Sequence, residues 1–198
     1  GTDLGGGAWL VTPGDLAGLT ITPPADYSGT INLTVTATST DGTDTASTTS
    51  NFAITVAGDA DAPTLSAANV SGTEDNAIAL NIASALSDTS ETLGVTIAGV
   101  PNGATLSAGT DLGGGAWLVT PGDLAGLTIT PPADYSGTIN LTVTATSTDG
   151  TDTASTTSNF AITVAGDADA PTLSAANVSG TEDNAIALNI SSALSDTS

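Results

Sequence analysis

Apolar and polar residues alternate along most of the chain, and this alternation predicts β-strands. Val, Ile and Thr recur at every second position in short runs, and clusters of Gly, Pro, Asn and Asp separate the runs. Helical periodicity is weak throughout. In the complete repeat unit defined below, the pattern predicts strands at 63–70, 77–82, 93–100, 104–107, 116–120, 127–130, 138–148 and 153–164.

The same alternation predicts which side chains face a core, because successive side chains of a strand point to opposite faces. Ile78, Leu80 and Ile82 fall on one face of the second strand, and Val95 and Ile97 on one face of the third. The later strands add a larger apolar set that would supply most of the core: Trp117, Leu127, Ile129, Ile139, Leu141, Val143, Phe160, Ile162 and Val164.

Two short segments carry specific local signals. Asn102-Gly103 accepts the positive φ angles of a two-residue hairpin, so it predicts a hairpin that leads into the strand at 104–107. Tyr135 precedes the strand at 138–148, where a tyrosine corner would hydrogen-bond back to the chain. We expect a structural role for Tyr135.

The chain repeats itself with an offset of 108 residues. Residues 1–90 recur as 109–198 with one difference, Ala83 against Ser191. The segment 91–108 occurs once and completes a 108-residue unit, which is the size of an independent domain. Near-identity of the copies favours a function served by repetition itself, such as length, number or avidity.

The phase of the repeat follows from its best linker, AGDADAPT at 57–64, in which small and acidic residues precede a Pro. This phasing predicts the C-terminal part of one domain at 1–58, a complete domain at 59–166 and the N-terminal part of the next at 167–198, as expected for an excerpt of a longer array. About 100 residues with seven to nine short strands per unit are typical of an immunoglobulin-like fold. We therefore expect an all-β protein of tandem immunoglobulin-like β-sandwiches with Greek-key connections.

Composition and charge narrow the function. The chain is 39% apolar, which is enough for a folded core, and its net charge is −21 because 21 acids face no Lys, Arg or His. Without basic side chains it cannot neutralise phosphates, so nucleic acid is excluded as a partner, and no apolar run is long enough for membrane insertion. Without His or Cys it lacks the usual triads, zinc ligands and thiolates, so we expect no enzyme.

The acids gather in turns and linkers. In a sandwich with this strand order, the turns at 74–76 and 131–136 share one pole with the departing linker at 165–172. The turn at 149–152 shares the other pole with the arriving linker at 57–64. Carboxylates gathered near Gly-bearing turns suit Ca²⁺, which takes 6 to 8 oxygen ligands. The candidate Ca²⁺ ligands, both copies included, are Asp26, Asp41, Asp44, Asp59, Asp61, Glu74, Asp75, Asp134, Asp149, Asp152, Asp167, Asp169, Glu182 and Asp183.

Four segments together carry a family resemblance: GTEDNAIALNI, LGVTIAGVPNGATLSAGTDLGGGAWLVTP, DLAGLTITPPADYSGTINLTVTATSTD and the linker GDADAP. As an ordered set they resemble the tandem immunoglobulin-like extender repeats of giant bacterial RTX adhesins, close to cadherin-like domains. The resemblance implies a secreted, cell-surface protein that binds Ca²⁺ between and within domains. It also implies a structural extender that projects a distal ligand-binding region for surface attachment or biofilm formation. The fuller Asp-Asn-Asp linker pattern of cadherins is missing, which leaves the number of ions open.

Several alternatives remain open at this level. The acids could be a solubilising coat without ions, and Asp111 and Asp123 could be turn formers or metal ligands. A repeated ligand-binding module could contact carbohydrate, ice or protein through exposed strand faces, such as the alternating Thr residues of 138–148 and their first-copy equivalents. The expected partners are neighbouring identical repeats in the chain, with head-to-tail association of the partial domains between molecules as a further option.

Overall fold

The computed structural model describes residues 1–195 and divides the chain into two compact units, Gly1–Asp59 and Ala60–Ser198. Strands account for 54% of the chain and helix for 3%, which confirms the predicted all-β class. The division into three repeat segments stays a prediction, and the last three residues of the segment 167–198 lie outside the described part.

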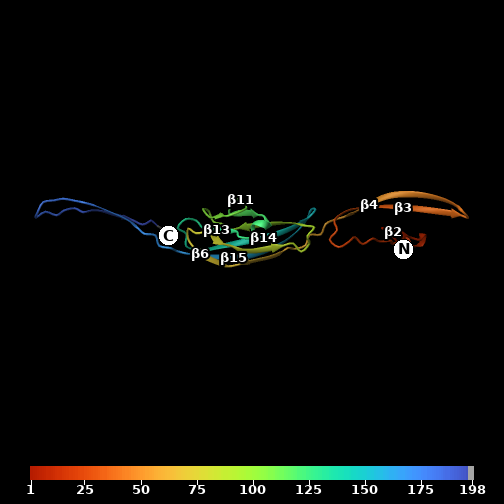
Figure 1. The fold of residues 1–198 in the computed structure, drawn as a ribbon, viewed down its shortest axis with the longest axis horizontal. Coiled ribbons are helices and arrows are strands. Elements are labelled where there is room, and N and C mark those ends of the chain that lie inside the picture. The colour runs from red at the N-terminus through yellow and green to blue at the C-terminus, as the bar shows by residue number, and fades with distance from the viewer. Residues whose placement is uncertain (196–198) are drawn as a thin grey trace. The chain divides into compact units, whose positions relative to one another are not determined.

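The larger sheet of the second unit has six strands in the order β11-β12-β9-β14-β15-β6 (Figure 1). All neighbours in it are antiparallel except β15 and β6, which run parallel. The long central hairpin pairs Gly137 with Val164 at one end and Asp149 with Asp152 at the other. The six strands of this sheet are β6 (Val70–Thr73), β9 (Thr92–Ala98), β11 (Thr110–Gly113), β12 (Ala116–Val119), β14 (Gly137–Asp149) and β15 (Asp152–Ala165).

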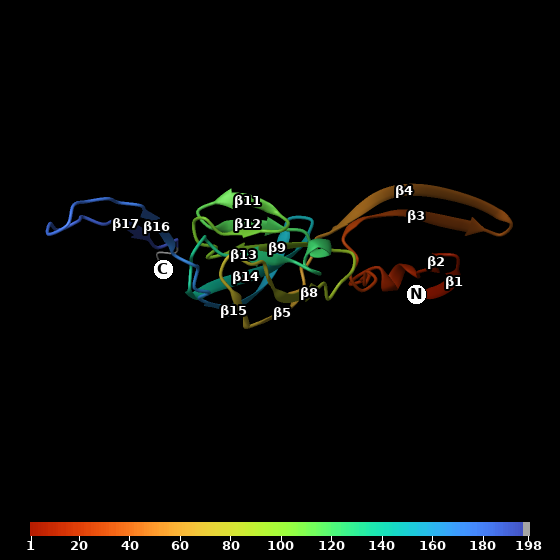
Figure 2. The ribbon, with the colours of Figure 1, turned by 60° about the vertical axis from the view of Figure 1, so that its left-hand side comes forward.

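Shorter strands form the rest of the second unit. β10 (Thr105–Leu106), β13 (Thr128–Thr130) and β7 (Ile78–Ala79) make a three-stranded sheet. β5 (Thr64–Ala68) pairs with β8 (Asn81–Ala85), and Figure 2 shows this pair beside the six-stranded sheet. A single 3₁₀ turn, η2 (Pro121–Asp123), precedes β13. After β15 the chain forms one more antiparallel pair, β16 (Thr172–Ala176) with β17 (Asn189–Ala193).

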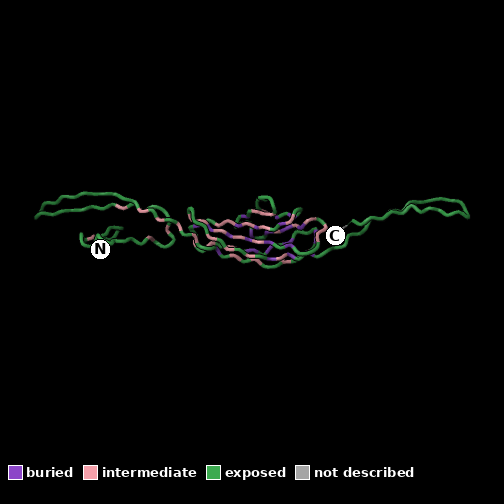
Figure 3. Tube along the Cα trace, turned by 180° about the vertical axis from the view of Figure 1, so that it is seen from behind, coloured by how far each residue is buried: buried purple, intermediate pink, exposed green. Residues whose placement is uncertain are grey.

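One apolar core lies between these sheets, where Figure 3 shows the buried residues gathered in the second unit. The six-stranded sheet contributes Val95, Ile97 and Val143, and the shorter strands contribute Ile78 and Ile129. The predicted inward faces of the strands at 77–82 and 93–100 are therefore confirmed. Sheets that share one core in this way give the unit a sandwich-like, layered architecture.

Trp117 corrects the predicted core, because it is only partly buried. It pairs with Ile97 of β9 on one side and with Asp111 of β11 on the other, one strand in from the edge of the sheet. The fully buried apolar side chain of this strand is Val119. The remaining predicted core residues from Leu127 to Val164 are buried.

The segment Asn102-Gly103 does not form a hairpin between neighbouring strands. It makes a turn, in which the N–H of Ala104 donates to the carbonyl of Pro101 at 3.1 Å and Gly103 has a φ of 88°. However, β9 pairs with β12 and β14, whereas β10 pairs with β13. The turn therefore carries the chain from one sheet to the other, and pairing with distant strands overrides the local hairpin preference.

The predicted strand at 63–70 is divided at Asn69. Its first part, β5, pairs with β8, and its second part, β6, pairs with β15. At the break the Asn69 side-chain oxygen accepts a hydrogen bond from the N–H of Ala161 at 2.8 Å. The side-chain oxygen of Asn69 thus accepts a hydrogen bond from β15, as a backbone carbonyl would, at the point where the strand passes from one sheet to the other.

Tyr135 forms the hydrogen bond expected of it, but in the opposite direction along the chain. Its hydroxyl donates to the carbonyl of Thr138, three residues downstream, at 3.0 Å. Tyr27 makes the equivalent bond to Thr30 at 3.1 Å in the first copy. The tyrosine therefore closes the local turn before β14 instead of reaching an upstream segment.

The first unit contains the same sequence as part of the second but buries little of it. It consists of β1 (Thr2–Gly5), β2 (Ala8–Leu10), the 3₁₀ turn η1 (Pro13–Asp15), β3 (Gly29–Asp41) and β4 (Asp44–Val56). β1 pairs with β2 and β3 with β4, in registers that match the second copy. Side chains that are core residues in the second unit are exposed or only half-buried here, because the strands that would cover them are absent from this unit.

The two copies allow a matched test of the core. Phe160 is 4% exposed and Phe52, at the equivalent position, is 49% exposed. Phe160→Ala should lower the free energy of unfolding of the second unit by about 3–5 kcal/mol. Phe52→Ala should change it by no more than about 0.5 kcal/mol. Urea unfolding followed by circular dichroism measures both, and equal effects of the two substitutions would contradict the assignment of the core.

Candidate metal centre

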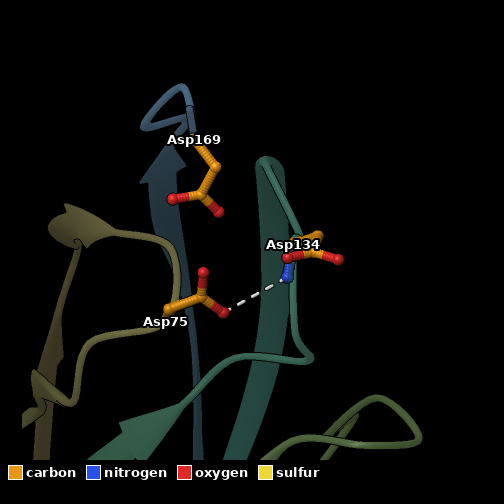
Figure 4. A group of neighbouring side chains, drawn as sticks. All are labelled: Asp75, Asp134 and Asp169. Atoms are coloured by element: carbon orange, nitrogen blue, oxygen red, sulfur yellow. Dashed lines mark hydrogen bonds between the residues drawn. The ribbon is translucent and has the colours of Figure 1, made fainter. Parts of the chain in front are cut away.

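Three aspartates from separate parts of the second unit meet at one end of its sheets, which we call the outgoing pole (Figure 4). Asp75 lies in the turn between β6 and β7, Asp134 in the loop before β14, and Asp169 in the segment that follows β15. Each offers one carboxylate oxygen, and these three oxygens all lie within 4.8 Å of one another. We call this group the triad.

Backbone geometry holds the triad in place. Asp75 and Asp134 have φ angles of 59° and 54°, in the left-handed region that Asp tolerates better than most residues. The Asp75 carboxylate accepts a hydrogen bond from the N–H of Asp134 at 3.2 Å, which joins the two turns. Asp26 and Asp183, the equivalents in the other copies, have the same left-handed conformation. The turn geometry is therefore a local property of the repeat.

Glu74 lies next to the triad in the chain and is only 2% exposed. Its Oε1 accepts a hydrogen bond from the N–H of Asp167 at 2.6 Å, and its own N–H donates to the carbonyl of Ala165 at 3.0 Å. Its Oε2 is buried and has no hydrogen-bond partner. A buried carboxylate oxygen without a protein partner is costly, and a water molecule or an ion would satisfy it.

The three carboxylates at this pole repel one another, and a cation could offset that repulsion. Two unit charges 4 Å apart repel by about 1 kcal/mol in water and by about 4 kcal/mol at the effective dielectric of a protein surface. The chain has no Lys, Arg or His to offset this repulsion. Carboxylate oxygens are ligands for hard cations such as Ca²⁺ and Mg²⁺. The triad could therefore hold a metal ion.

The opposite end of the second unit, the incoming pole, binds the segment that enters it. The Asp152 carboxylate accepts a hydrogen bond from the N–H of Ala60 at 2.9 Å. The Glu91 carboxylate accepts one from the N–H of Asp61 at 2.6 Å. Asp149 is half-buried at the end of the β14–β15 hairpin, beside Asp152. The predicted acids Asp61, Asp149 and Asp152 thus belong to this pole, together with one residue that was not predicted.

Glu91 is the site residue that the sequence analysis missed. It is 5% exposed, and its Oε2 is buried without a partner. Two signals could have identified it: it directly precedes a strand, and it lies in the turn that shares a pole with residues 149–152. Neighbouring Asp88 is a turn residue, because its carboxylate accepts hydrogen bonds from the hydroxyl and the backbone N–H of Ser90. These hydrogen bonds also hold the pKa of the Asp88 carboxyl below its ordinary value.

The remaining predicted ligands lie outside any group of three converging acids within residues 1–195. Asp41 and Asp44 face each other at the end of the β3–β4 hairpin, and the Asp44 carboxylate accepts the N–H of Thr45. Asp111 and Asp123 are turn formers, bound to the N–H of Gly113 and the hydroxyl of Thr120. The other predicted ligands are exposed repeat equivalents or linker residues: Asp26, Asp59, Glu182 and Asp183.

Comparison with known proteins adds no family assignment. No protein-family model matches the chain, and its sequence matches no curated protein. Over the residues that the structure describes, no helix has the length and apolar character needed to cross a bilayer.

Ca²⁺ should stabilise the second unit through the triad. Binding adds about 2.7 kcal/mol to the free energy of unfolding when free Ca²⁺ is 100-fold above its dissociation constant. Asp134→Asn should abolish most of this gain, because it removes one of three converging charges. Thermal melts with Ca²⁺ and with a chelator measure the difference.

Asp26→Asn is the matched control for this measurement. Asp26 has the same local sequence and backbone angle as Asp134, but within residues 1–195 it belongs to no group of three converging acids. This variant should keep the full Ca²⁺ response. A loss of the response in both variants, or in neither, would contradict the triad as the binding site.

Proposed function

We propose that this chain is a section of a structural extender in a secreted bacterial adhesin, with no catalytic activity. Its immunoglobulin-like repeats are stiffened by Ca²⁺ at the interdomain linkers, and the array projects a distal ligand-binding region from the cell surface for attachment or biofilm formation. The single observation that carries the proposal is that Asp169, in the segment after β15, joins a carboxylate triad with two turns of the same unit.

The strand arrangement supports the immunoglobulin-like part of the proposal. In the constant-type immunoglobulin sandwich the third, sixth and seventh strands lie side by side in one sheet. Here β9, β14 and β15 lie side by side in the same way, and β5 pairs with β8 outside that sheet. The connection from β9 to β10 passes from one sheet to the other, which fits the same topology.

The linker contacts support the stiffening mechanism. Glu74 holds the backbone of Asp167, and Asp169 brings its carboxylate to Asp75 and Asp134. A cation shared by these carboxylates ties the linker to both turns at once. Without the cation, repulsion among the same groups favours an open and flexible linker.

Dimensions and repetition support a role in reach. β14 has 13 residues, which at ~3.3 Å per residue corresponds to a domain about 40 Å long. Two copies that differ at one position in 90 offer the same surfaces again instead of a new site. A long array of such domains extends far from its anchor, and each added repeat contributes the same length.

The exposed threonine face carries less weight as an alternative binding surface. Thr144 and Thr157 share a hydrogen bond between their hydroxyls at 3.2 Å, and Thr142 donates to Asn159 at 2.7 Å. These side chains therefore satisfy one another across β14 and β15. A solvated strand face accounts for them without a ligand.

The stiffening mechanism is testable within this chain, which has no native cysteine to interfere with labelling. Spin labels at Thr163→Cys on β15 and Ser174→Cys on β16 span the linker, and both positions are exposed. The distance distribution measured by pulsed electron paramagnetic resonance should be narrow with Ca²⁺ and broad with a chelator. A distance distribution of the same width with Ca²⁺ and with chelator would overturn the stiffening mechanism.

The same pair of labels combined with Asp134→Asn supplies the control. This variant should give the broad distribution with or without Ca²⁺, whereas the labels with Asp26→Asn should respond like the parent chain. Glycan or ice adsorption by the repeats alone would instead favour the ligand-binding alternative.

A further inference from the structure

We propose that copies of this chain join by strand exchange, in which the segment 172–193 of one copy covers the inner face of the β3–β4 hairpin of another. The contact needs neither calcium nor the proposed function. Two apolar faces are exposed in the described part of the chain, and the second unit shows how the same two sequences pack together.

The accepting surface is the inner face of the first-unit hairpin. β3 and β4 pair in the same register as β14 and β15. Val143 and Phe160 are 0% and 4% exposed, whereas their equivalents Val35 and Phe52 are both 49% exposed. Monomeric proteins rarely expose a contiguous apolar face, so such a face marks an interaction site. The hairpin is therefore formed, but within residues 1–195 nothing buries its inner face as the second unit does.

The donating surface is the segment 172–193, which repeats the sequence of residues 64–85. Its strands β16 and β17 pair in the register of β5 and β8. The one difference between the two copies, Ser191 for Ala83, falls at a position that is exposed in both. The segment therefore keeps every apolar side chain that its counterpart contributes to the core.

Those apolar side chains are exposed in the donating segment, as Figure 3 shows. Leu188 and Ile190 are 71% and 60% exposed, whereas their counterparts Leu80 and Ile82 are each 7% exposed. Burial of apolar surface is the main favourable term in protein association, as it is in folding. One chain thus carries both halves of an interface that two copies can complete.

The second unit supplies the template for this interface. There β5 contacts both β14 and β15, and β6 runs parallel to β15 with Ser71 opposite Thr163. The equivalent pairing between two copies places Ser179 of one copy opposite Thr55 of the other. The donated segment would therefore add a parallel strand to the edge of β4 and cover the inner face of the hairpin.

The interface between copies is weaker than its template. In the second unit β9 lies between β12 and β14, and residues 91–108 occur only once in the chain, so the donated segment brings no counterpart of β9. The net charge of −21 on each copy also opposes association, and salt screens this repulsion. Association should therefore increase with protein concentration and with ionic strength.

The contact is heterologous, because each copy donates one surface and accepts through another. Heterologous contacts build rings or open filaments, so the parent chain should not stop at a dimer. Nearly identical repeats favour such exchange, since a half-domain fits a neighbouring molecule as well as it fits its own repeat. Between adjacent arrays the same exchange would tie one molecule to another.

Two blocked variants test the exchange in the full chain. Phe52→Asp disrupts the accepting surface and Ile190→Asp the donating surface, both at exposed positions, so the second unit stays folded. Sedimentation equilibrium at high salt should show species larger than a dimer for the parent chain. Each variant alone should associate at least about tenfold more weakly. An equimolar mixture of the two should form dimers and nothing larger, because each dimer has one working surface of each kind.

Thr49→Asp and Ser174→Asp are the matched controls. They place the same charge on the outward faces of the same two surfaces and should associate like the parent chain. Association of Ile190→Asp alone would reveal a different contact, such as pairing between the β3 edges of two copies, and would overturn the proposal. A parent chain that stays monomeric at every concentration and salt level would overturn it as well.

Disulfide formation tests the register, since the chain has no cysteine of its own. Neighbouring strands lie about 4.8 Å apart, which is within disulfide range. A mixture of Thr55→Cys chains and Ser179→Cys chains should therefore form the mixed disulfide under mild oxidation. Thr49→Cys with Ser179→Cys is the control, because Thr49 lies six residues along β4, and equal yields for the two mixtures would contradict the parallel register.

Discussion

The structure depends on buried carboxylates that accept hydrogen bonds from linker backbone. Glu74 and Glu91 lie at opposite ends of the second unit, and each binds the N–H of a linker aspartate at 2.6 Å. A charge-assisted bond of this kind is short and strong, and it fixes where the chain enters and leaves the sheets. The cost is that each glutamate keeps one buried oxygen without a protein partner.

The apolar core and the acidic poles are separate parts of this arrangement. The core joins Val95, Ile129 and Ile162 across the layers and contains no charge, so it stabilises the unit at any ion concentration. The acids lie where the strands end and the linkers begin. In the proposed extender, removal of an ion should therefore loosen the linkers while the sheets stay folded.

The chain has a narrow set of reactive side chains. Carboxylates and hydroxyls are its only reactive side chains, and the described pockets are shallow grooves on strand surfaces, such as the one lined by Asn69, Asn140 and Phe160. Some of its hydroxyls form hydrogen bonds within the sheet or to the entering segment, as Thr142 and Ser147 show.

The sequence by itself determined the all-β class, the 108-residue repeat and the inward faces of the strands, because alternation and turn chemistry are local. It also placed Asp75, Asp134 and Asp169 at one pole, since each lies in a recognisable turn or linker. Tertiary structure alone decided that Asn102-Gly103 crosses between sheets, that Asn69 divides the first strand, and that Trp117 is only partly buried. It also revealed Glu91, whose importance comes from burial against a linker 30 residues away in the chain. Such features depend on which distant strands pair, and that choice is made by the packing of the whole core.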